Sequence, residues 1–191
     1  MQWWAILLIV IAVLAFFGII FAAWWIATYN KLIKRENDVD EAYSTMDVYM
    51  KKRYDLIPNI VETVKGYTKH ENETLENVMK ARYSSMMAKN PEEKAQSENL
   101  LAGTLKSLFA VTENYPDLKA DKQYTQLINS LRDIETEIAS SRKYYNGTVK
   151  VFNNTRETFP SNIVAKKYKF EAKVLFEIAN AIERENPQVK F

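Results

Sequence analysis

The chain has 191 residues, and 26 Lys and Arg side chains against 24 Asp and Glu give a formal net charge of only +2. Such a near balance lacks the basic field that binds nucleic acid, so no nucleic-acid partner is expected. Cysteine is absent and histidine occurs once, which excludes disulfides, thiolate metal sites and cysteine nucleophiles. Glycine and proline are scarce, at 4 and 5 residues. This composition favours long helices.

The first element is an apolar segment, 3–28, that contains no charged side chain. As an α-helix it would be about 39 Å long, at about 1.5 Å per residue, and the hydrocarbon core of a bilayer is about 30 Å thick. Tryptophan prefers the membrane–water interface. Tryptophans mark both ends of the segment: Trp3, Trp4, Trp24 and Trp25. The sequence therefore predicts a transmembrane anchor over 1–28.

Two alternatives to an anchor are a buried core helix and a cleaved signal peptide. A core helix that is apolar on every face would be unusual in a chain of this length. A signal peptide normally has a positively charged start, an apolar stretch of about 7–15 residues and a small-residue cleavage site. Here the chain starts with Met-Gln, and the bulky Trp24 and Trp25 lie where cleavage would fall. These features favour a retained single-pass anchor.

Basic residues follow the apolar segment directly, at Lys31, Lys34 and Arg35. Lys and Arg near a span are retained on the cytoplasmic side. The expected topology in the cell membrane is therefore an outer N-terminus and a cytoplasmic body. The same cations are expected to lie on anionic lipid headgroups, although topology marking alone would also explain them.

Beyond the anchor, apolar residues recur in two rows at helical spacing, a coiled-coil-like pattern typical of a bundle helix. The rows are Leu32, Val39, Met46, Ile60 and Tyr67, and then Tyr43, Met50, Ile57, Val64 and Val78. The first soluble helix is expected to continue to about Lys89, and one option is a single rod that includes the anchor. Pro58 lies in its middle and predicts a kink near 54–57, with a full break as the alternative.

Three further helical segments are predicted from start and stop signals. Asn90 and Pro91 begin a second helix that ends near Pro116, and Asp121 caps a third that ends before Phe159. Ser161 or Asn162 would cap a fourth segment.

The pattern over 168–181 is still compatible with a helix, and the chain closes in a tail. Short connections make consecutive helices antiparallel neighbours. The predicted fold is all-α, with a transmembrane helix (1–28), a long antiparallel helical bundle (29–186) and a C-terminal tail (187–191).

Short motifs occur along the chain in a fixed order. They lie at 29–33, 47–48, 52–59 (KRYDLIPN), 62–67, 70–71, 74–76, 81–82, 113–119 (ENYPDLK), 144–146, 152–153, 159–162 and 187–191. This ordered set resembles the LemA family over nearly the whole chain, with Tyr43 where the family more often has Trp. At 168–176 the family has a more loop-like stretch that contains Gly and Pro. The resemblance implies a bacterial single-pass membrane protein with an antiparallel helical bundle. It also implies roles in membrane-associated processes, such as magnetosome membrane formation in one branch, and it carries over no enzymatic activity to this chain.

The pair His70-Glu71 invites comparison with a zinc protease. A zinc helix needs a second His four residues on, and position 74 is Thr. Carboxylate di-metal sites pair a Glu with a His three residues later, and position 67 is Tyr. We therefore expect no catalytic residue, no metal and no cofactor, and we expect His70 at the surface or at a helix end.

Arg53 lies in an otherwise apolar row and is the most informative charge of the chain. It is expected to be a buried or partly buried charge that fixes packing or receives an anionic partner, unless it snorkels over apolar surface. Its candidate partners are Asp47, Asp55, Glu71 and Glu135. Together with Tyr54, Asp55, Pro58 and Asn59 it forms a candidate packing or interaction element.

Asparagines in the third helix, at Asn146, Asn153 and Asn154, are expected to form interhelical hydrogen bonds because buried amides need partners.

The expected function is that of a non-enzymatic membrane protein whose helical body is a scaffold. Its partners would be the lipid bilayer, a second copy of the chain or another membrane protein. A regulatory adaptor that acts with a membrane protease is one alternative. An enzyme that uses carboxylates on the bundle is the other.

Overall fold

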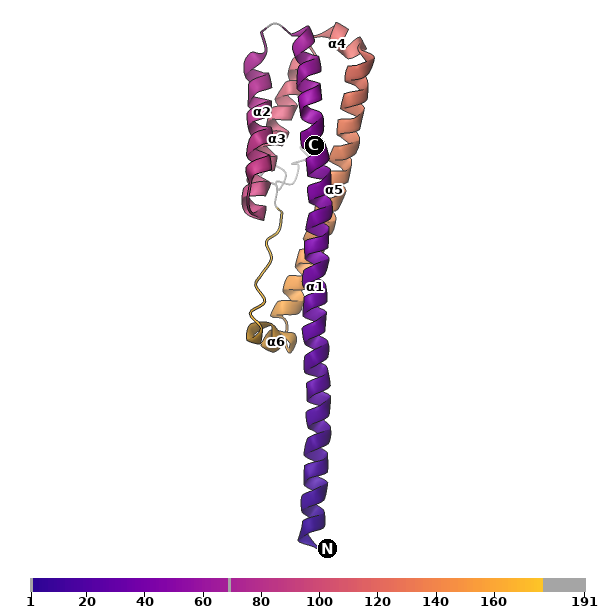
Figure 1. Ribbon diagram of the computed structural model, residues 1–191, viewed down its shortest axis with the longest axis vertical. Helices are drawn as coiled ribbons and strands as arrows, with labels where there is room; N and C mark the ends of the chain where they lie inside the picture. Colours follow the sequence, from indigo (N-terminus) through magenta and orange to yellow (C-terminus); the bar gives the residue numbers. More distant parts are fainter. Residues whose placement is uncertain (1, 69, 177–191) are drawn as a thin grey trace, which may run out of the picture. The chain divides into compact units, whose positions relative to one another are not determined.

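The computed structural model describes residues 2–68 and 70–176, and within these ranges the chain forms helices and no strand (Figure 1). The prediction of an all-α fold is confirmed. The helices are α1 (Trp3–Tyr67), α2 (Asn72–Met87), α3 (Pro91–Thr112), α4 (Pro116–Ala120), α5 (Lys122–Glu157) and α6 (Ser161–Lys167).

The chain divides into two compact units. The α6 unit comprises Met1–Glu41 and Gly147–Lys173, and the bundle unit comprises Ala42–Asn146 and Val174–Phe191. Helices α1 and α5 each contribute residues to both units. The earlier division into 1–28, 29–186 and 187–191 stays a prediction.

Helix α1 is a single helix of 65 residues, so the apolar segment and the first soluble helix are continuous. Pro58 lies inside it, and the alternative of a full break is wrong. The helix is long and apolar enough to cross a membrane, and none of its most apolar window is buried. A core helix would be mostly buried, so that alternative does not fit.

The prediction that this helix reaches Lys89 is wrong, because α1 ends at Tyr67 and α2 begins at Asn72. Gly66, which weakens a helix, lies in the last turn of α1. The apolar rows continue across the break because α2 buries Leu75 and Val78 as α1 buries Val64. Heptad spacing is the same for one long helix and for two that fold back on each other.

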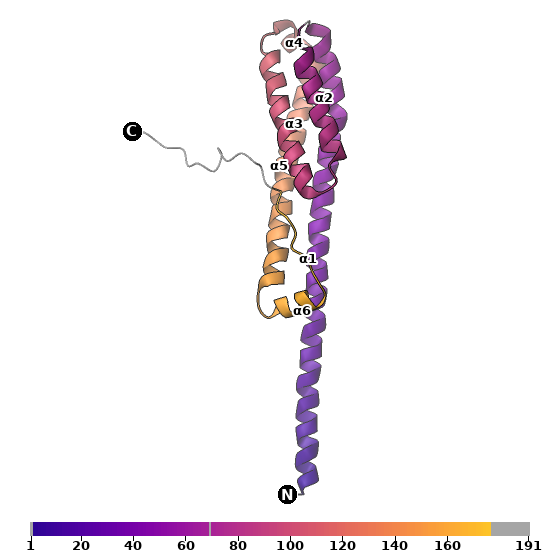
Figure 2. The same ribbon diagram turned by 90° about the vertical axis from the view of Figure 1, so that its left-hand side faces the viewer.

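In the bundle unit, α1 from Ala42, α2, α3 and the first part of α5 lie side by side, and consecutive helices run antiparallel (Figures 1 and 2). Short α4, which the sequence did not predict, connects α3 to α5. The core contains large apolar side chains from these helices, among them Met46, Met50, Ile57, Ile60, Leu75, Val78, Leu101, Leu105, Leu108, Leu118, Leu131 and Ile138.

Two predicted helix starts in the bundle unit are confirmed by their caps. The Asn90 carboxamide oxygen accepts the backbone N–H of Glu93 at 2.8 Å, with Pro91 opening α3. One oxygen of Asp121 accepts the backbone N–H of Tyr124 at 2.8 Å, at the start of α5. Each cap satisfies a donor that a helix start leaves free.

In the α6 unit, α6 packs against α1 through a small apolar cluster. Its fully buried members are Leu32, Val164 and Ala165, with Trp24, Trp25, Tyr29 and Phe170 packed around them. The predicted caps Ser161 and Asn162 are wrong, because Pro160 precedes α6 without a side-chain cap. The Ser161 hydroxyl instead donates to the carbonyl of Thr155 at 2.6 Å.

Residues 170–176 run without regular structure after α6, so the helix with which the pattern over 168–181 is compatible does not form there. The predicted interhelical bonds of Asn146 and Asn153 are wrong, because their amides bind the backbone of this stretch, while the bond expected of Asn154 stays a prediction. In the α6 unit, Asn153 donates to the carbonyl of Lys173 at 2.8 Å and accepts its N–H at 3.0 Å. In the bundle unit, Asn146 makes the same pair of bonds with Phe176. Residues 177–191, which include the predicted tail, lie outside the described residues.

Candidate functional site

The candidate site is a cluster of charged and polar side chains in the core of the bundle unit, with Arg53 at its centre. Arg53 lies one heptad after Met46 and one before Ile60, so α1 directs all three into the core. Its side chain is buried, with 1% of the residue exposed. The predicted burial of this charge is confirmed, and the snorkelling alternative is wrong.

A single guanidinium joins three helices at this point. Arg53 of α1 forms an ion pair with Glu98 of α3, which is 2% exposed. It also pairs with Glu135 of α5, with 2.8 Å between Nη1 and Oε1. The second carboxylate oxygen of Glu98 accepts the hydroxyl of Tyr54. We call Arg53, Tyr54, Glu98 and Glu135 the Arg53 node.

Two further cations contact Tyr54, one at its ring and one at its backbone. The ammonium of Lys94 lies 5.2 Å from the ring centroid and 3.4 Å from a carboxylate oxygen of Asp47. Nε of Arg82 donates to the Tyr54 backbone carbonyl at 2.6 Å. Positive charges thus lie close to the carboxylates that neutralise them, as buried charges require.

Burial and nearby charges shift the pKa of Tyr54, in the node, and of Arg142, close to it. Burial raises the pKa of Tyr54 above its ordinary value, the charge of Arg53 opposes this effect, and the carboxylate of Asp47 adds to it. Burial also lowers the pKa of Arg142, an effect that the charge of Arg53 reinforces and that of Glu135 opposes. Both shifts follow from charges that have lost water.

The structure brings together only some of the residues that the sequence marked. Arg53, Tyr54 and Glu135 meet in the node, whereas Asp55 and Asn59 are exposed on α1 and Pro58 is half-buried. The roles of these five motif residues in packing or interaction stay predictions.

Two of the carboxylates proposed as partners of Arg53 bind other groups. Asp47 pairs with Lys94, and Glu71 accepts the hydroxyl of Tyr115 at 3.2 Å. Glu98, the most buried partner of Arg53, was missed. A signal for it existed, because Glu98 shares a helical face with Leu101 and Leu105 and so stands in an apolar row.

The charged and polar groups of the node contact one another, so their chemistry is that of ion pairs and hydrogen bonds between helices. Within 2–68 and 70–176, no three His, Asp or Glu side chains gather in a metal-binding geometry. His70, as predicted, is exposed at a helix connection. Arg53 and Glu98 neutralise each other. A buried ion pair of this kind suits a role in fixing the register between two helices.

Replacing Tyr54 by phenylalanine is expected to change how stability depends on pH. The folded pKa of Tyr54 is raised, so its contribution is complete below about pH 10, the unfolded value, and decreases as pH rises toward the folded value. The wild type should therefore lose up to about 1.4 kcal/mol per pH unit more than Tyr54→Phe in this range. Denaturant unfolding of the full chain in detergent at pH 8 and pH 11 measures the difference. The exposed Tyr144→Phe is the control, and equal slopes in all three proteins would contradict the expectation.

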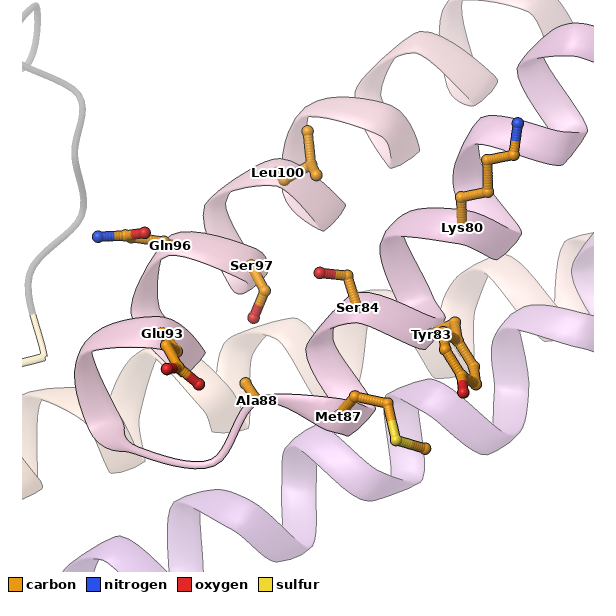
Figure 3. A pocket seen from close by; sticks show the side chains of 9 residues that line it. All are labelled: Lys80, Tyr83, Ser84, Met87, Ala88, Glu93, Gln96, Ser97 and Leu100. Carbon is orange, nitrogen blue, oxygen red and sulfur yellow. The ribbon is translucent and has the colours of Figure 1, made fainter.

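A second feature of the bundle unit is a surface groove of 640 Å³ between α2 and α3 (Figure 3). Tyr83 and Met87 of α2 and Leu100 of α3 line it and are each more than half exposed. The remaining lining residues are mostly polar: Lys80, Ser84, Ala88, Glu93, Gln96 and Ser97.

Comparison with known proteins fits this helical architecture. Residues 42–191 match the model of the LemA family. The chain is also 30% identical, over 166 residues, to the Protein LemA of Metamycoplasma hominis, an alignment that covers 84% of this chain and 73% of that protein. The motifs around the Arg53 node, the all-α fold and these two matches agree, and the chain belongs to the LemA family.

Proposed function

We propose that this protein is a non-enzymatic scaffold, held in a membrane by the first part of α1, whose bundle unit associates with a second copy of the chain. The observation that carries the proposal is the groove between α2 and α3, where apolar side chains of both helices lie exposed. Apolar surface with a polar rim marks interaction sites on folded proteins.

The chemistry of the groove suits a symmetric contact. Met87 has a flexible, polarisable side chain that adapts to a partner surface, and Tyr83 and Leu100 supply apolar area. Lys80 and Glu93 lie on opposite helices of the groove. In a twofold dimer, when one residue contacts a second residue of the other copy, the reverse contact forms as well. A patch that carries a lysine and a glutamate is therefore suited to pair opposite charges between the two copies.

The absence of enzymatic activity is part of the proposal. The buried charges Arg53 and Glu98 neutralise each other in the Arg53 node instead of facing the groove. The buried ammonium of Lys94 pairs with Asp47. The groove itself offers hydroxyls and single charges, without the nucleophile and base in contact that covalent catalysis uses.

Self-association can be tested by crosslinking, because the chain contains no cysteine of its own. We expect Met87→Cys, in membranes at native expression, to give a crosslinked dimer with a short bifunctional maleimide. Glu137→Cys, exposed on α5 in the same unit, is the matched control and should stay monomeric. Monomer at both positions, or a product of the mass of a different protein, would overturn the proposed self-association.

The membrane topology is also a proposal, with the N-terminus outside and the bundle unit in the cytoplasm. Lys31 and Lys34 are exposed just beyond the apolar segment, where cations are retained on the cytoplasmic side.

A membrane-impermeant maleimide tests this topology. In intact cells it should label Gln2→Cys, and it should reach Lys80→Cys only after the cells are permeabilised. The reverse pattern would place the bundle unit outside.

A further inference from the structure

We infer that α6 and the turn before it form a second membrane contact, which lies in the headgroup layer beside α1 and binds anionic phospholipid. This inference rests on the proposed insertion of α1 into the membrane. It concerns residues 158–170, a part of the chain far in sequence from the apolar segment. The surface consists of Phe159, Ile163, Lys166, Lys167 and Lys169, and we call it the α6 surface.

The first step is the position of α6 along α1. Within the α6 unit, α6 lies beside α1 (Figure 2). Val164 and Ala165 share a buried cluster with Leu32, and Tyr168 follows the last residue of α6, Lys167. The indole N–H of Trp25 donates to the hydroxyl of Tyr168 at 3.3 Å. The rings of Tyr29 and Tyr168 lie 4.5 Å apart between centroids. Within the α6 unit, α6 is therefore held beside residues 24–32 of α1, and we call this position the α6 level.

The α6 level spans the end of the apolar segment at Thr28 and the first charged side chain, Lys31. Tryptophan and tyrosine settle at the headgroups, and each headgroup layer is about 5–8 Å thick outside the hydrocarbon core. From Trp25 to Leu32 a helix rises by about 10 Å. With α1 inserted, α6 is thus held where the hydrocarbon ends and the headgroups begin.

The second step is the apolar side chains that α6 leaves uncovered. Phe159 is 80% exposed, the highest value for a large hydrophobic side chain in the part of the chain that the structure describes. Ile163 is 47% exposed on the first turn of α6. These side chains lie outside the α1 segment, and apolar groups beside an interface are stabilised by entering it.

The third step is charge. Residues 158–170 contain Lys166, Lys167 and Lys169 and no acid, and all three lysines are exposed. The stretch of α1 at the α6 level, 24–32, contains one cation, Lys31, and no acid, and Lys34 and Arg35 follow it directly. Apolar side chains flanked by lysines are typical of helices that lie on anionic membranes.

A second copy of the chain suits this surface poorly. In a twofold contact the lysines of one α6 surface would face those of the other, and like charges repel. An anionic lipid surface matches both the apolar and the basic parts.

The test uses the full chain in nanodiscs made from a mixture of anionic phosphatidylglycerol and zwitterionic phosphatidylcholine, with one spin label at an introduced cysteine. Phe159→Cys reports on the α6 surface, and Ile11→Cys reports on the proposed anchor. Tyr144→Cys, exposed on α5 in the bundle unit, is the aqueous control. Oxygen collects in lipid and a nickel chelate collects in water, so their relative access reports the surroundings of each label.

We expect the labels at positions 159 and 11 to favour oxygen by several-fold over the label at 144. A lipid-like label at 11 with a water-like label at 159 would overturn the α6 inference and leave the anchor intact. A water-like label at 11 would overturn the proposed anchoring itself. Low access of both reagents at 159 would indicate protein contact, and would also overturn the inference.

A separate set of variants tests whether the lysines of the α6 surface bind anionic lipid. In anionic discs the label at 159 should lie deeper than in purely zwitterionic discs. The triple variant Lys166→Gln, Lys167→Gln, Lys169→Gln should abolish this difference. A control of equal charge change in the bundle unit should keep it: Lys106→Gln, Lys122→Gln, Lys143→Gln. Equal depth in the two lipids for the wild type would overturn the requirement for anionic lipid.

Discussion

Replacing Arg53 by alanine is expected to destabilise the bundle unit by about 3–5 kcal/mol, because the carboxylate of Glu98 would stay in the core without its cation. Glu98 is 2% exposed and cannot turn to water. Glu135, whose side chain is 42% exposed, can be hydrated when its partner is lost. The loss therefore comes mainly from the pair between α1 and α3. Denaturant unfolding of the full chain in detergent, followed by helical circular dichroism, measures it.

A compensated variant separates the charge from the packing. Arg53→Met with Tyr54→Phe and Glu98→Leu removes the buried charges and the hydroxyl that Glu98 accepts. Apolar replacement of a buried ion pair is often neutral or stabilising, so this triple variant should recover most of the stability. Asp55→Asn, next to the node but exposed, is the control and should change the free energy of unfolding by less than about 0.5 kcal/mol. A loss for Arg53→Ala no larger than that of the control would contradict a structural role for the node.

Truncating Phe152 to alanine is expected to cost the α6 unit about 3–5 kcal/mol, the range for removing a fully buried aromatic ring. Phe152 is 0% exposed, and its ring centroid lies 6.4 Å from that of Phe170. Without this ring, the stretch that follows α6 loses an apolar partner on α5. Hydrogen exchange of backbone amides should therefore accelerate over 161–173 before it changes in the bundle unit.

Two variants support the interpretation of that measurement. Phe152→Leu keeps much of the volume and should lose less stability than the alanine variant. Val151→Ala changes an exposed neighbour on the same helix and should leave exchange over 161–173 as in the wild type. Uniform acceleration across both units would show that the site does not act locally.

The features that were predicted correctly are determined by residues close to one another in the sequence. The caps Asn90 and Asp121 satisfy donors within three residues of themselves, so their chemistry can be recognised without the fold. The burial of Arg53 followed from its place in a heptad row, because a helix has only one face toward the core.

What the sequence did not predict depends on the path of the chain between elements. The end of α1 at Tyr67 changes no apolar spacing, so a periodic pattern does not reveal it. Asn153 and Lys173 are 20 residues apart. The sequence around either residue does not indicate that the Asn153 amide will bind the backbone of Lys173. Glu98 was missed for a related reason, since its partner Arg53 lies on another helix.

The Arg53 node also constrains how this sequence can change by descent. Exchange of Arg53 alone leaves the buried carboxylate of Glu98 without its cation, and exchange of Glu98 alone leaves Arg53 with only the partly exposed Glu135 as a partner, whereas exchange of both together is expected to be tolerated. The two positions are therefore epistatic: a substitution that is neutral in one background is damaging in the other. Single substitutions reach an apolar pair at positions 53 and 98 only through a variant of low stability. The ion pair is therefore difficult to lose in evolution, even though it contributes little net stability.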